Sequence, residues 1–241
     1  WAEGVLAKLD DAHIQKMLGT EFGGMNEVMA DLYADTGDRR WLALSDRFQH
    51  RAIVDPLARR EDILAGKHGN TQVPKLLGSL VRYLATGNEA DATAARFFWD
   101  QDLRTGIEEM AKRLPQRLFL KGAGDMAEKT ARVTALVKSL AEHAGLDETI
   151  KVDAIRAAQL CKADLMSHLV GEFPELQGQM GMYFARAAGE SEAVALAIAE
   201  HYLPRFAQDL LPTSHPGALL ALADRIDSIV ACFRVGAIPT G

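Results

Sequence analysis

Residues 215–234 read HPGALLALADRIDSIVACFR, an unbroken run with the spacing of a helix. Its apolar side chains together form a wide stripe along such a helix. The stripe comprises Leu219, Leu220, Leu222, Ala223, Ile226, Ile229, Val230 and Phe233. A helix with so wide a stripe is expected to lie deep in a bundle, because apolar surface left in water costs free energy.

Helical patterns also fill the rest of the second half of the chain. The further helices predicted there cover about 126–144, 151–170, 175–188 and 190–202. Glycines 145 and 189, the segment 171–174 and a loop before Pro216 separate them. Alternating β-branched runs with hairpin turns, which are typical of strands, are nearly absent. The chain is therefore predicted to be all-α.

The first hundred residues contain a repeated unit. Tyr33, Thr36, Gly37 and Phe48 recur 50 positions later as Tyr83, Thr86, Gly87 and Phe98. A glycine after a helical pattern ends the helix, so each Thr-Gly pair joins two helices. The repeat predicts stacked antiparallel helical hairpins, because one hairpin cannot bury both of its apolar faces. Solenoids and closed rings of helices both contain such pairs, and two units do not decide between them.

Composition restricts the class of protein. The 241 residues can form one large domain or two modest ones, with 48% hydrophobic and 25% charged residues. No apolar run approaches the roughly 18 residues that cross a bilayer, so no membrane contact is expected. Residues 1–100 hold 12 basic and 15 acidic side chains, and residues 101–241 hold the remaining 15 and 18. Neither half has the positive surplus of a strong sequence-independent nucleic-acid binder, although local patches are allowed.

The two cysteines, Cys161 and Cys232, have no partner at metal-ligand spacing. Free, buried thiols in a reducing compartment are favoured over a disulfide, and the cytoplasm is the expected location. We expect no cofactor and no bound metal.

Two motifs flank the first predicted hairpin. Residues 21–27 read EFGGMNE, residues 68–74 read HGNTQVP, and LYADTGD lies between them at 32–38. In this order and spacing they resemble the β-L-arabinofuranosidase-type glycoside hydrolases, over roughly residues 5–100. The resemblance implies a toroid of helical hairpins whose helix ends line a sugar pocket. By position, it implies that Glu21, His68, Asn70 and Gln72 hydrogen-bond sugar hydroxyls.

Structural roles compete with sugar binding at these positions. Glu21 and Asn26 precede or begin a helix and can cap it, and Asn70 can cap the helix that begins near Pro74. His68 can make a structural hydrogen bond instead of a ligand contact. The resemblance places the catalytic glutamate and the zinc-bound cysteine beyond the equivalent of Asp100, where this sequence departs from the family. Glycoside hydrolysis is therefore not expected.

A second set of motifs begins near Ala95. The chain reads KADL at 162–165, GEFPELQG at 171–178, HYLPR at 201–205, LAD at 222–224 and PTG at 239–241. These strings resemble the β subunit of the bacterial two-subunit glycyl-tRNA synthetase, over about residues 95–241. The resemblance implies an HD-like helical bundle. It also implies a role in tRNA contact or subunit assembly, while the paired α subunit performs aminoacylation.

HD-type phosphohydrolases hold a metal ion with histidines, an adjacent His-Asp pair and a distal Asp. No His-Asp dipeptide occurs in this sequence. Lys162 stands near the expected position, where its ammonium group would repel a metal, and Asp224 alone does not complete the site. We therefore predict no catalytic residues and no metal ligands.

Several polar residues of the second half are candidates for tRNA or partner contact. They are Lys129, Arg132, Lys162, Glu172 and Gln177. A solvated charged face is the competing interpretation for the basic residues, and capping of a helix near Pro174 is the competing one for Glu172. His201 is expected at a helix end, where a cationic imidazole is stabilised.

The segment ARFFWD at 95–100 fits both resemblances, so the chain is predicted to be a chimera joined there. Residues 1–100 are expected to form a helical-hairpin segment of glycoside-hydrolase type. Residues 101–241 are expected to form an HD-like domain of synthetase β-subunit type. The predicted function is that of a noncatalytic module that contacts tRNA or the synthetase α subunit. The alternative is a hydrolase fragment that retains part of a sugar pocket and binds a sugar.

Overall fold

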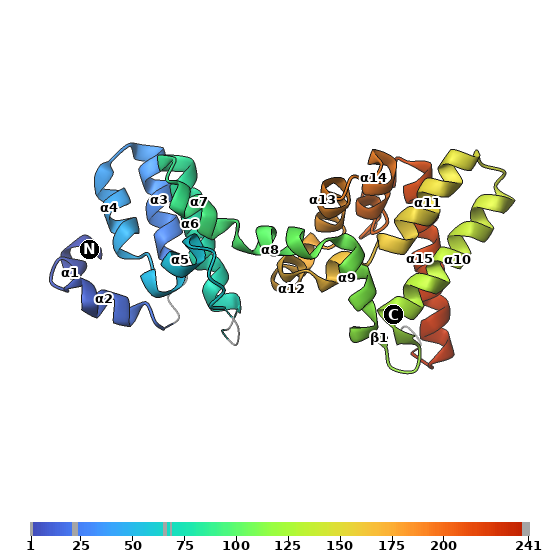
Figure 1. Cartoon of the computed structure of the whole chain (residues 1–241), viewed down its shortest axis with the longest axis horizontal. Coiled ribbons are helices and arrows are strands. Elements are labelled where there is room, and N and C mark those ends of the chain that lie inside the picture. Colours follow the sequence, from blue (N-terminus) through green and yellow to red (C-terminus); the bar gives the residue numbers. More distant parts are fainter. Residues whose placement is uncertain (1, 21–23, 65–66, 68, 238–241) are drawn as a thin grey trace. The chain divides into compact units, whose positions relative to one another are not determined.

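The computed structural model describes residues 2–20, 24–64, 67 and 69–237 (Figure 1). The chain divides into two compact units, Trp1–Asp100 and Gln101–Gly241. Among the described residues, the regular elements are helices apart from one two-stranded hairpin, which confirms the all-α prediction. None of the described helices has the length and apolar character needed to cross a membrane.

The described part of unit 1 is built from helices of different lengths. They are α1 (Ala2–Leu6), α2 (Asp11–Met17), α3 (Met25–Thr36), α4 (Arg39–Arg47), α5 (Arg51–Ala58), α6 (Gly69–Thr86), α7 (Glu89–Ala95) and the start of α8 (Phe97–Thr105). Helix α3 packs against both α4 and α6, and α6 packs against α7. The two predicted helical hairpins are therefore α3–α4 and α6–α7.

The two hairpins turn in the same way. Gly37 has φ +69° and Gly87 has φ +71°, in the left-handed region that glycine adopts without strain. In the first turn, the Thr36 hydroxyl donates to the Leu32 carbonyl and accepts from the Asp38 amide. The hydroxyl of Thr86 makes the equivalent pair of bonds in the second turn. The repeated Thr-Gly pair therefore encodes one turn geometry twice.

Two apolar clusters and a buried polar network hold unit 1 together. One cluster contains Leu6, Ile14, Leu18, Met29, Leu44 and Phe48, and the other contains Ile53, Val54, Leu57, Leu76, Ala94 and Phe97. Asn26, expected as a possible helix cap, lies instead in the first turn of α3 with its side chain fully buried. Its amide donates to Gln49 Oε1 and to the Lys75 carbonyl, both at 3.0 Å. Asn26 thus joins α3 to α6, because a buried amide requires partners.

Unit 2 is a helical bundle with one small hairpin. Its elements are the end of α8, α9 (Ile107–Arg113), η1 (Leu114–Gln116), β1 (Leu118–Leu120), β2 (Gly124–Asp125), α10 (Met126–His143), α11 (Glu148–Leu160), η2 (Ala163–Met166), α12 (His168–Glu172), η3 (Pro174–Leu176), α13 (Gln179–Ala187), α14 (Glu192–Glu200) and α15 (His215–Arg234). Strands β1 and β2 pair antiparallel. Helix α15 packs against α10, α11 and α14.

The single helix predicted over 151–170 is wrong. Helix α11 ends at Leu160, and the 3₁₀ turn η2 and helix α12 follow. The cause is Asp164, whose buried carboxylate accepts hydrogen bonds from the backbone N–H groups of Gly178 at 2.5 Å and Gly181 at 3.1 Å. These bonds satisfy N–H groups at the start of α13, which have no partner within the helix. A straight helix through residue 164 would lose them.

Helix α15 has the bounds that its sequence predicts, but it does not lie deep in the bundle. Leu222, Ile229, Val230 and Phe233 are 49–58% exposed, whereas Leu220 and Ala223 are fully buried. The described part of the unit covers one side of α15 only, so half of its wide apolar stripe faces outward.

Candidate functional site

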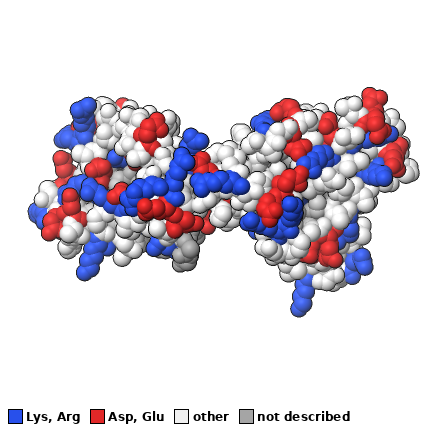
Figure 2. Space-filling view, viewed as in Figure 1, with Lys and Arg blue, Asp and Glu red and all other residues white. Residues whose placement is uncertain are grey.

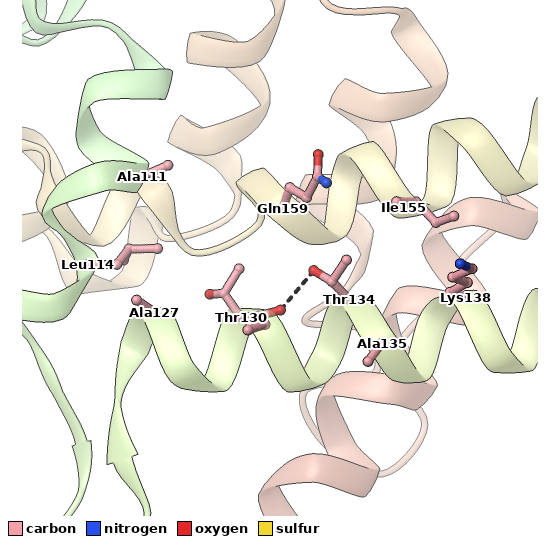
Figure 3. A pocket seen from close by; sticks show the side chains of 10 residues that line it. Ala111, Leu114, Ala127, Thr130, Thr134, Ala135, Lys138, Ile155 and Gln159 are labelled. Carbon is pink, nitrogen blue, oxygen red and sulfur yellow. Dashed lines mark hydrogen bonds between the residues drawn. The ribbon is translucent and has the colours of Figure 1, made fainter.

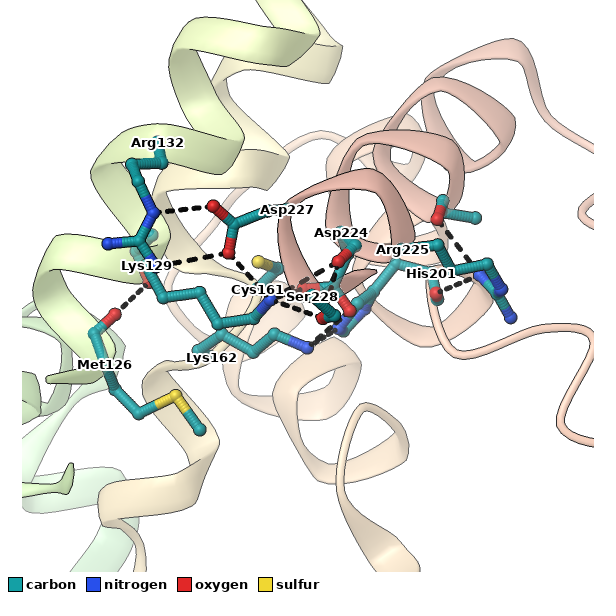
Figure 4. A network of polar contacts seen from close by, with 12 residues as sticks. Met126, Lys129, Arg132, Cys161, Lys162, His201, Asp224, Arg225, Asp227 and Ser228 are labelled. Carbon is teal, nitrogen blue, oxygen red and sulfur yellow. Dashed lines mark hydrogen bonds and ion pairs between the residues drawn. The ribbon is translucent and has the colours of Figure 1, made fainter. Parts of the chain in front are cut away.

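A buried cluster of charged side chains lies where α10 meets α15 (Figure 4). The Lys129 ammonium is 3.2 Å from Asp227 Oδ2 and 3.1 Å from Asp224 Oδ1, and it donates to Ser228 Oγ at 2.8 Å. Arg132 contacts the same Asp227 through Nε at 2.6 Å and Nη2 at 3.2 Å. This hydrogen bond with Asp227 raises the pKa of the Arg132 guanidinium above its usual value.

The other half of the cluster comes from the end of α11 and from α14. Lys162, two residues after the end of α11, has its ammonium 2.8 Å from His201 Nε2 and 3.2 Å from Asp224 Oδ2. The Tyr202 ring lies 4.2 Å from the same ammonium group. Asp224 therefore bridges Lys129 and Lys162, and four segments of the chain meet in one network.

His201 is neutral in this network. Burial is the main cause that lowers the pKa of its imidazole to about 3, and the neighbouring Lys162 cation adds to it. The expectation of a cationic His201 at a helix end is therefore wrong. It does stand at the end of α14, but in a site where water cannot solvate its charge. Burial would raise the pKa of Asp224, and the neighbouring cations, Lys162 foremost and Lys129 with it, outweigh burial and lower that pKa.

The cluster is suited to holding helices together rather than to chemistry. The ammonium groups of Lys129 and Lys162 lie between its carboxylates, and a divalent cation placed there would be repelled. Within the part of the chain that the structure describes, no group of three or more His, Cys, Asp or Glu could hold a metal ion. The neighbouring Cys161 is fully buried, and burial raises the pKa of its thiol to about 12, so it is not a nucleophile near neutral pH.

The cluster also holds the small β-hairpin in place. Lys129 lies 4.5 Å from the centre of the Phe119 ring on β1, and Arg132 lies 5.9 Å from it. Arg132 Nη1 also donates to the carbonyl of Ala123, directly before β2, at 3.3 Å. The two cations therefore tie the hairpin to α10 and α15. No local sequence pattern indicates this contact.

The structure places the predicted contact residues in different environments. Lys129 and Lys162 are 2% and 3% exposed, so neither ammonium faces a partner in this structure. The reason is that each is paired inside the bundle with carboxylates on α15, Lys129 with Asp224 and Asp227 and Lys162 with Asp224. The Arg132 side chain is 36% exposed. Glu172 ends α12 half-buried, and Gln177 is exposed after η3. A partner-contact role for Glu172 and Gln177 stays a prediction.

Of the predicted sugar-binding residues, Glu21 and His68 lie outside the described residues, as does the side chain of Asn70 at the start of α6. Gln72 is described and is 9% exposed. Its Oε1 accepts a hydrogen bond from Lys75 Nζ at 3.1 Å, and that ammonium lies 2.9 Å from His50 Nδ1. The Gln72 amide oxygen thus contributes to the interior of unit 1. Sugar binding stays a prediction.

An apolar groove of about 480 Å³ runs between α9, α10 and α11 (Figure 3). The hydroxyls of Thr130 and Thr134 donate to carbonyls one turn earlier in α10, so toward a ligand they can act only as acceptors. Lys138 and Gln159 are the polar side chains that complete the lining with them. Among the described residues that line the groove there is no Asp, Glu, His or Cys that could act as a general acid, base or nucleophile.

Acidic and basic side chains are interspersed over both units on the face that Figure 2 shows. One stretch departs from this mixture. Residues 112–121 read KRLPQRLFLK and contain four basic side chains and no acidic ones. Lys112, Arg113, Arg117 and Lys121 are all exposed. The prediction from sequence missed these residues, although the unbroken basic run was a signal that could have found them.

Comparison with known proteins places this site in a family. A profile of the glycyl-tRNA synthetase beta subunit matches residues 89–241, which include the whole ion cluster and the basic run. The chain belongs to the glycyl-tRNA synthetase beta subunit family, as the motifs from Ala95 onward indicate.

Individual relatives are glycine–tRNA ligase beta subunits. The subunit of Halalkalibacterium halodurans is 44% identical over 162 residues, which are 66% of this chain and 23% of the relative. That of Myxococcus xanthus is 49% identical over 147 residues, 61% of this chain and 21% of the relative. That of Streptococcus thermophilus is 45% identical over 251 residues, 99% of this chain and 35% of the relative. The chain thus spans between about a fifth and about a third of their length.

Unit 1 has a second resemblance. A profile of the β-L-arabinofuranosidase GH127 catalytic domain matches residues 1–105. Both resemblances read from the sequence are therefore confirmed, and they fit the predicted chimera. The Streptococcus thermophilus alignment also extends over unit 1, because it covers 99% of the chain.

Proposed function

We propose that this chain is a noncatalytic helical module of a glycyl-tRNA synthetase β subunit, and that it contacts tRNA through the exposed basic run 112–121. The relatives are named as ligases of glycine and tRNA, which makes tRNA the polyanion to consider. The observation that carries the proposal is the position of this run, from the end of α9 through η1 and β1, with all four basic side chains exposed.

The basic run is only partly neutralised by its surroundings. Lys112 and Arg113 share one carboxylate, Glu109, at 3.4 Å and 3.7 Å. Arg117 Nη1 donates to the Leu165 carbonyl, a neutral group that leaves its charge intact. Such exposed ion pairs contribute little to stability, so exchanging them for phosphate contacts has a small cost. The local surplus of positive charge fits a phosphate backbone.

The ion cluster supports tRNA contact indirectly, because it holds the strand that carries part of the basic run. Lys129 and Arg132 contact Phe119 on β1, and Lys121 follows that strand directly. We infer that these two cations position the basic run, while Lys112, Arg113, Arg117 and Lys121 make the contact itself. In this division of roles Lys129, a candidate contact residue in the sequence analysis, acts from a buried position.

The test is a titration of the chain with tRNA(Gly) at two salt concentrations. Reversing two charges in Arg117→Glu/Lys121→Glu should weaken binding and reduce the slope of log K against log salt by roughly 1.4–1.8, about 0.7–0.9 for each lost phosphate contact. The matched control is Lys8→Glu/Lys16→Glu, which changes net charge equally at two exposed lysines of unit 1. Equal losses in both double variants would show nonspecific attraction only, and an unchanged slope in the first would refute the proposal.

A further inference from the structure

A small pocket lies where the turn of the β-hairpin meets the last turns of α15. It has a volume of about 60 Å³ and is lined by Ala123, Arg132, Asp227, Val230, Ala231 and Arg234. One water molecule needs roughly 10–15 Å³ of such space, so the pocket has room for a group of several atoms. It is far smaller than the roughly 300 Å³ at which pockets for drug-sized ligands begin. Its size therefore fits a small ion, or one terminal group of a larger molecule.

The hairpin forms one wall of this pocket. Gly122 has φ +88°, and a Cβ added there would lie 3.3 Å from Val235 Cγ1, so the hairpin turn packs closely against the end of α15. The carbonyl of Ala123 accepts a hydrogen bond from Arg132 Nη1 at 3.3 Å, which joins the same turn to α10. Three elements that are far apart in the sequence therefore enclose the pocket.

Two arginines bring unused hydrogen-bond donors to the pocket. A guanidinium has five N–H donors, and the bonds of Arg132 to Asp227 and Ala123 use three of them. One terminal nitrogen of Arg132 is directed away from Asp227 (Figure 4). Arg234 is exposed in the last turn of α15, and its guanidinium has no hydrogen bond or ion pair with another described residue. Such forks of N–H groups match the oxygens of a phosphate group.

The charges around the pocket favour an anion. Among the described residues that line it, Asp227 is the one carboxylate, and both Arg132 and Lys129 hold it. Asp125 and Glu128 also interact electrostatically with Arg132. Both of these carboxylates, however, accept backbone N–H groups in the capping box of α10. The lining thus carries two positive charges and one negative charge, and the Lys129 ammonium lies 3.2 Å from the negative one.

The end of α15 does not present free carbonyls to an anion. The last carbonyls of a helix carry partial negative charge and usually disfavour anions. In α15 the carbonyls of residues 231, 232 and 233 accept the N–H groups of residues 235, 237 and 236, respectively, at 2.9–3.2 Å. Gly236, with φ +77°, allows the chain to turn back in this way. These carbonyls are therefore satisfied beside the pocket.

We propose that this pocket binds a phosphate group, held between the guanidinium groups of Arg132 and Arg234. The oxygens of one phosphate group can accept hydrogen bonds from both arginines at once, which a chloride ion cannot do in the same bidentate way. The group can come from free phosphate or from the backbone of an RNA. The inference does not rest on the proposed tRNA contact, because phosphate alone is expected to bind.

Titration of the intact, isotope-labelled chain with inorganic phosphate tests the proposal, with amide NMR signals as the readout. Ionic strength is held constant with chloride. We expect saturable shifts at the amides of Ala123, Val230 and Ala231, with a dissociation constant in the millimolar range. Arg234→Ala should weaken binding by about 10-fold, since it removes one charged fork. Arg234→Lys keeps the charge without the fork, so its affinity should lie between those of Arg234→Ala and the wild type.

The matched control is Arg104→Ala. Arg104 is likewise an exposed arginine in the last turn of a helix, and it does not line the pocket. This variant should bind phosphate as the wild type does. Shifts that do not saturate, shifts confined to the basic run 112–121, or an equal loss of affinity in Arg104→Ala and Arg234→Ala would overturn the proposal.

A competition experiment distinguishes the two sources of the phosphate group. If the pocket takes a backbone phosphate, tRNA(Gly) should displace inorganic phosphate, and Arg234→Ala should reduce the slope of log K against log salt by roughly 0.7–0.9. If it takes free phosphate, tRNA should leave the phosphate-induced shifts in place. Loss of tRNA contact through the basic run would not remove these shifts. Failure of the phosphate titration would likewise leave the proposed tRNA contact standing.

Discussion

The Lys162 ammonium donates a hydrogen bond to Nε2 of His201 over 2.8 Å, and both side chains are buried. The ring can accept there because its other nitrogen, Nδ1, donates to the Ile198 carbonyl at 2.5 Å. One tautomer of a neutral imidazole is therefore fixed between a cation and a backbone carbonyl. A histidine so held does not exchange protons near neutral pH, which fits a structural role.

The first prediction concerns pH. Because the pKa of His201 is lowered to about 3 in the folded chain and is about 6.5 in an unfolded one, the unfolded state binds more protons between these values. Stability contributed by the neutral ring is thus complete above pH 6.5 and is lost as pH falls, by about 1.4 kcal/mol per pH unit. Hydrogen exchange of the α15 amides between pH 7 and pH 4 should show this loss.

The variant His201→Gln serves as the control for that titration. Glutamine can still accept from Lys162 but cannot be protonated, so its stability should change less steeply over the same range. Asp164 has the opposite effect on stability as pH falls. Burial raises the pKa of its carboxyl to about 6, so here the folded state binds the proton more readily than the unfolded state. It is present in both proteins, so the difference between them isolates His201. Parallel profiles of stability against pH for the two proteins would show that His201 does not cause the loss of stability at low pH.

The second prediction concerns Asp227. Replacing it with Ala removes the carboxylate that Lys129 and Arg132 share. Breaking a buried ion pair costs about 3–5 kcal/mol, because the remaining charge stays buried without its partner. Urea unfolding followed by circular dichroism should show a loss of this size. Glu148→Ala, at an 81% exposed carboxylate paired with Lys151, should change stability by less than about 1 kcal/mol.

The third prediction separates positioning from contact in the proposed tRNA site. Phe119→Ala removes the ring beneath Lys129 and Arg132 but leaves all four exposed cations in place. We expect tRNA affinity to fall several-fold while the salt dependence keeps its slope, since the number of phosphate contacts is unchanged. A variant that binds tRNA as the wild type does would show that the ring does not position the basic run.

The fourth prediction concerns two glycines. Gly178 has φ +80°, and a Cβ there would lie 2.6 Å from the Tyr202 ring. Gly178→Ala should therefore destabilise unit 2 by about 2 kcal/mol or more, through both strain and overlap. Gly171 in α12 has no atom within 4 Å of an added Cβ, so Gly171→Ala should be neutral or stabilise by up to about 1 kcal/mol. The thermal unfolding temperatures of both variants test this difference. Equal changes in stability would show that the conformation and close packing of Gly178 do not matter.

The fifth prediction concerns the thiols. Both cysteines are free, with Cys161 buried and Cys232 partly exposed. Since the thiolate is the reactive form, and burial raises the pKa of Cys161 to about 12, a thiol reagent should modify Cys232 alone in the folded chain. Both should react in denaturant. Rapid modification of both in the native protein would show that the site around Cys161 opens readily.

Local patterns predicted the elements that depend on neighbours in sequence. The spacing of apolar residues located the last helix, and the repeated Thr-Gly pairs located both hairpin turns, because the bonds of Thr36 and Thr86 reach no further than four residues. The break after Leu160 could not be predicted in this way. It depends on Asp164 reaching the N–H groups of Gly178 and Gly181, 14 and 17 residues away.

The candidate site also depends on residues far apart in the sequence, which local patterns do not connect. Lys129 and Lys162 stand out in the sequence as basic residues, which are usually at the surface. Their burial depends on Asp224 and Asp227, which are 62 to 98 positions away from the lysines that they bind. The exposed basic run 112–121 was visible in the sequence, yet only the fold shows that Phe119 ties it to the cluster.

By itself, the sequence determined that the fold class is all-α, that the chain carries the motifs of a synthetase β subunit after those of an arabinofuranosidase, and that its last helix spans residues 215–234. Helical periodicity and family motifs are properties of the order of residues, so they can be read without a fold. Only the tertiary structure decided which side of α15 is buried. The wide apolar stripe allows either side to face the bundle, and the buried lysines drew Asp224 and Asp227 inward and left Leu222, Ile229 and Phe233 outside.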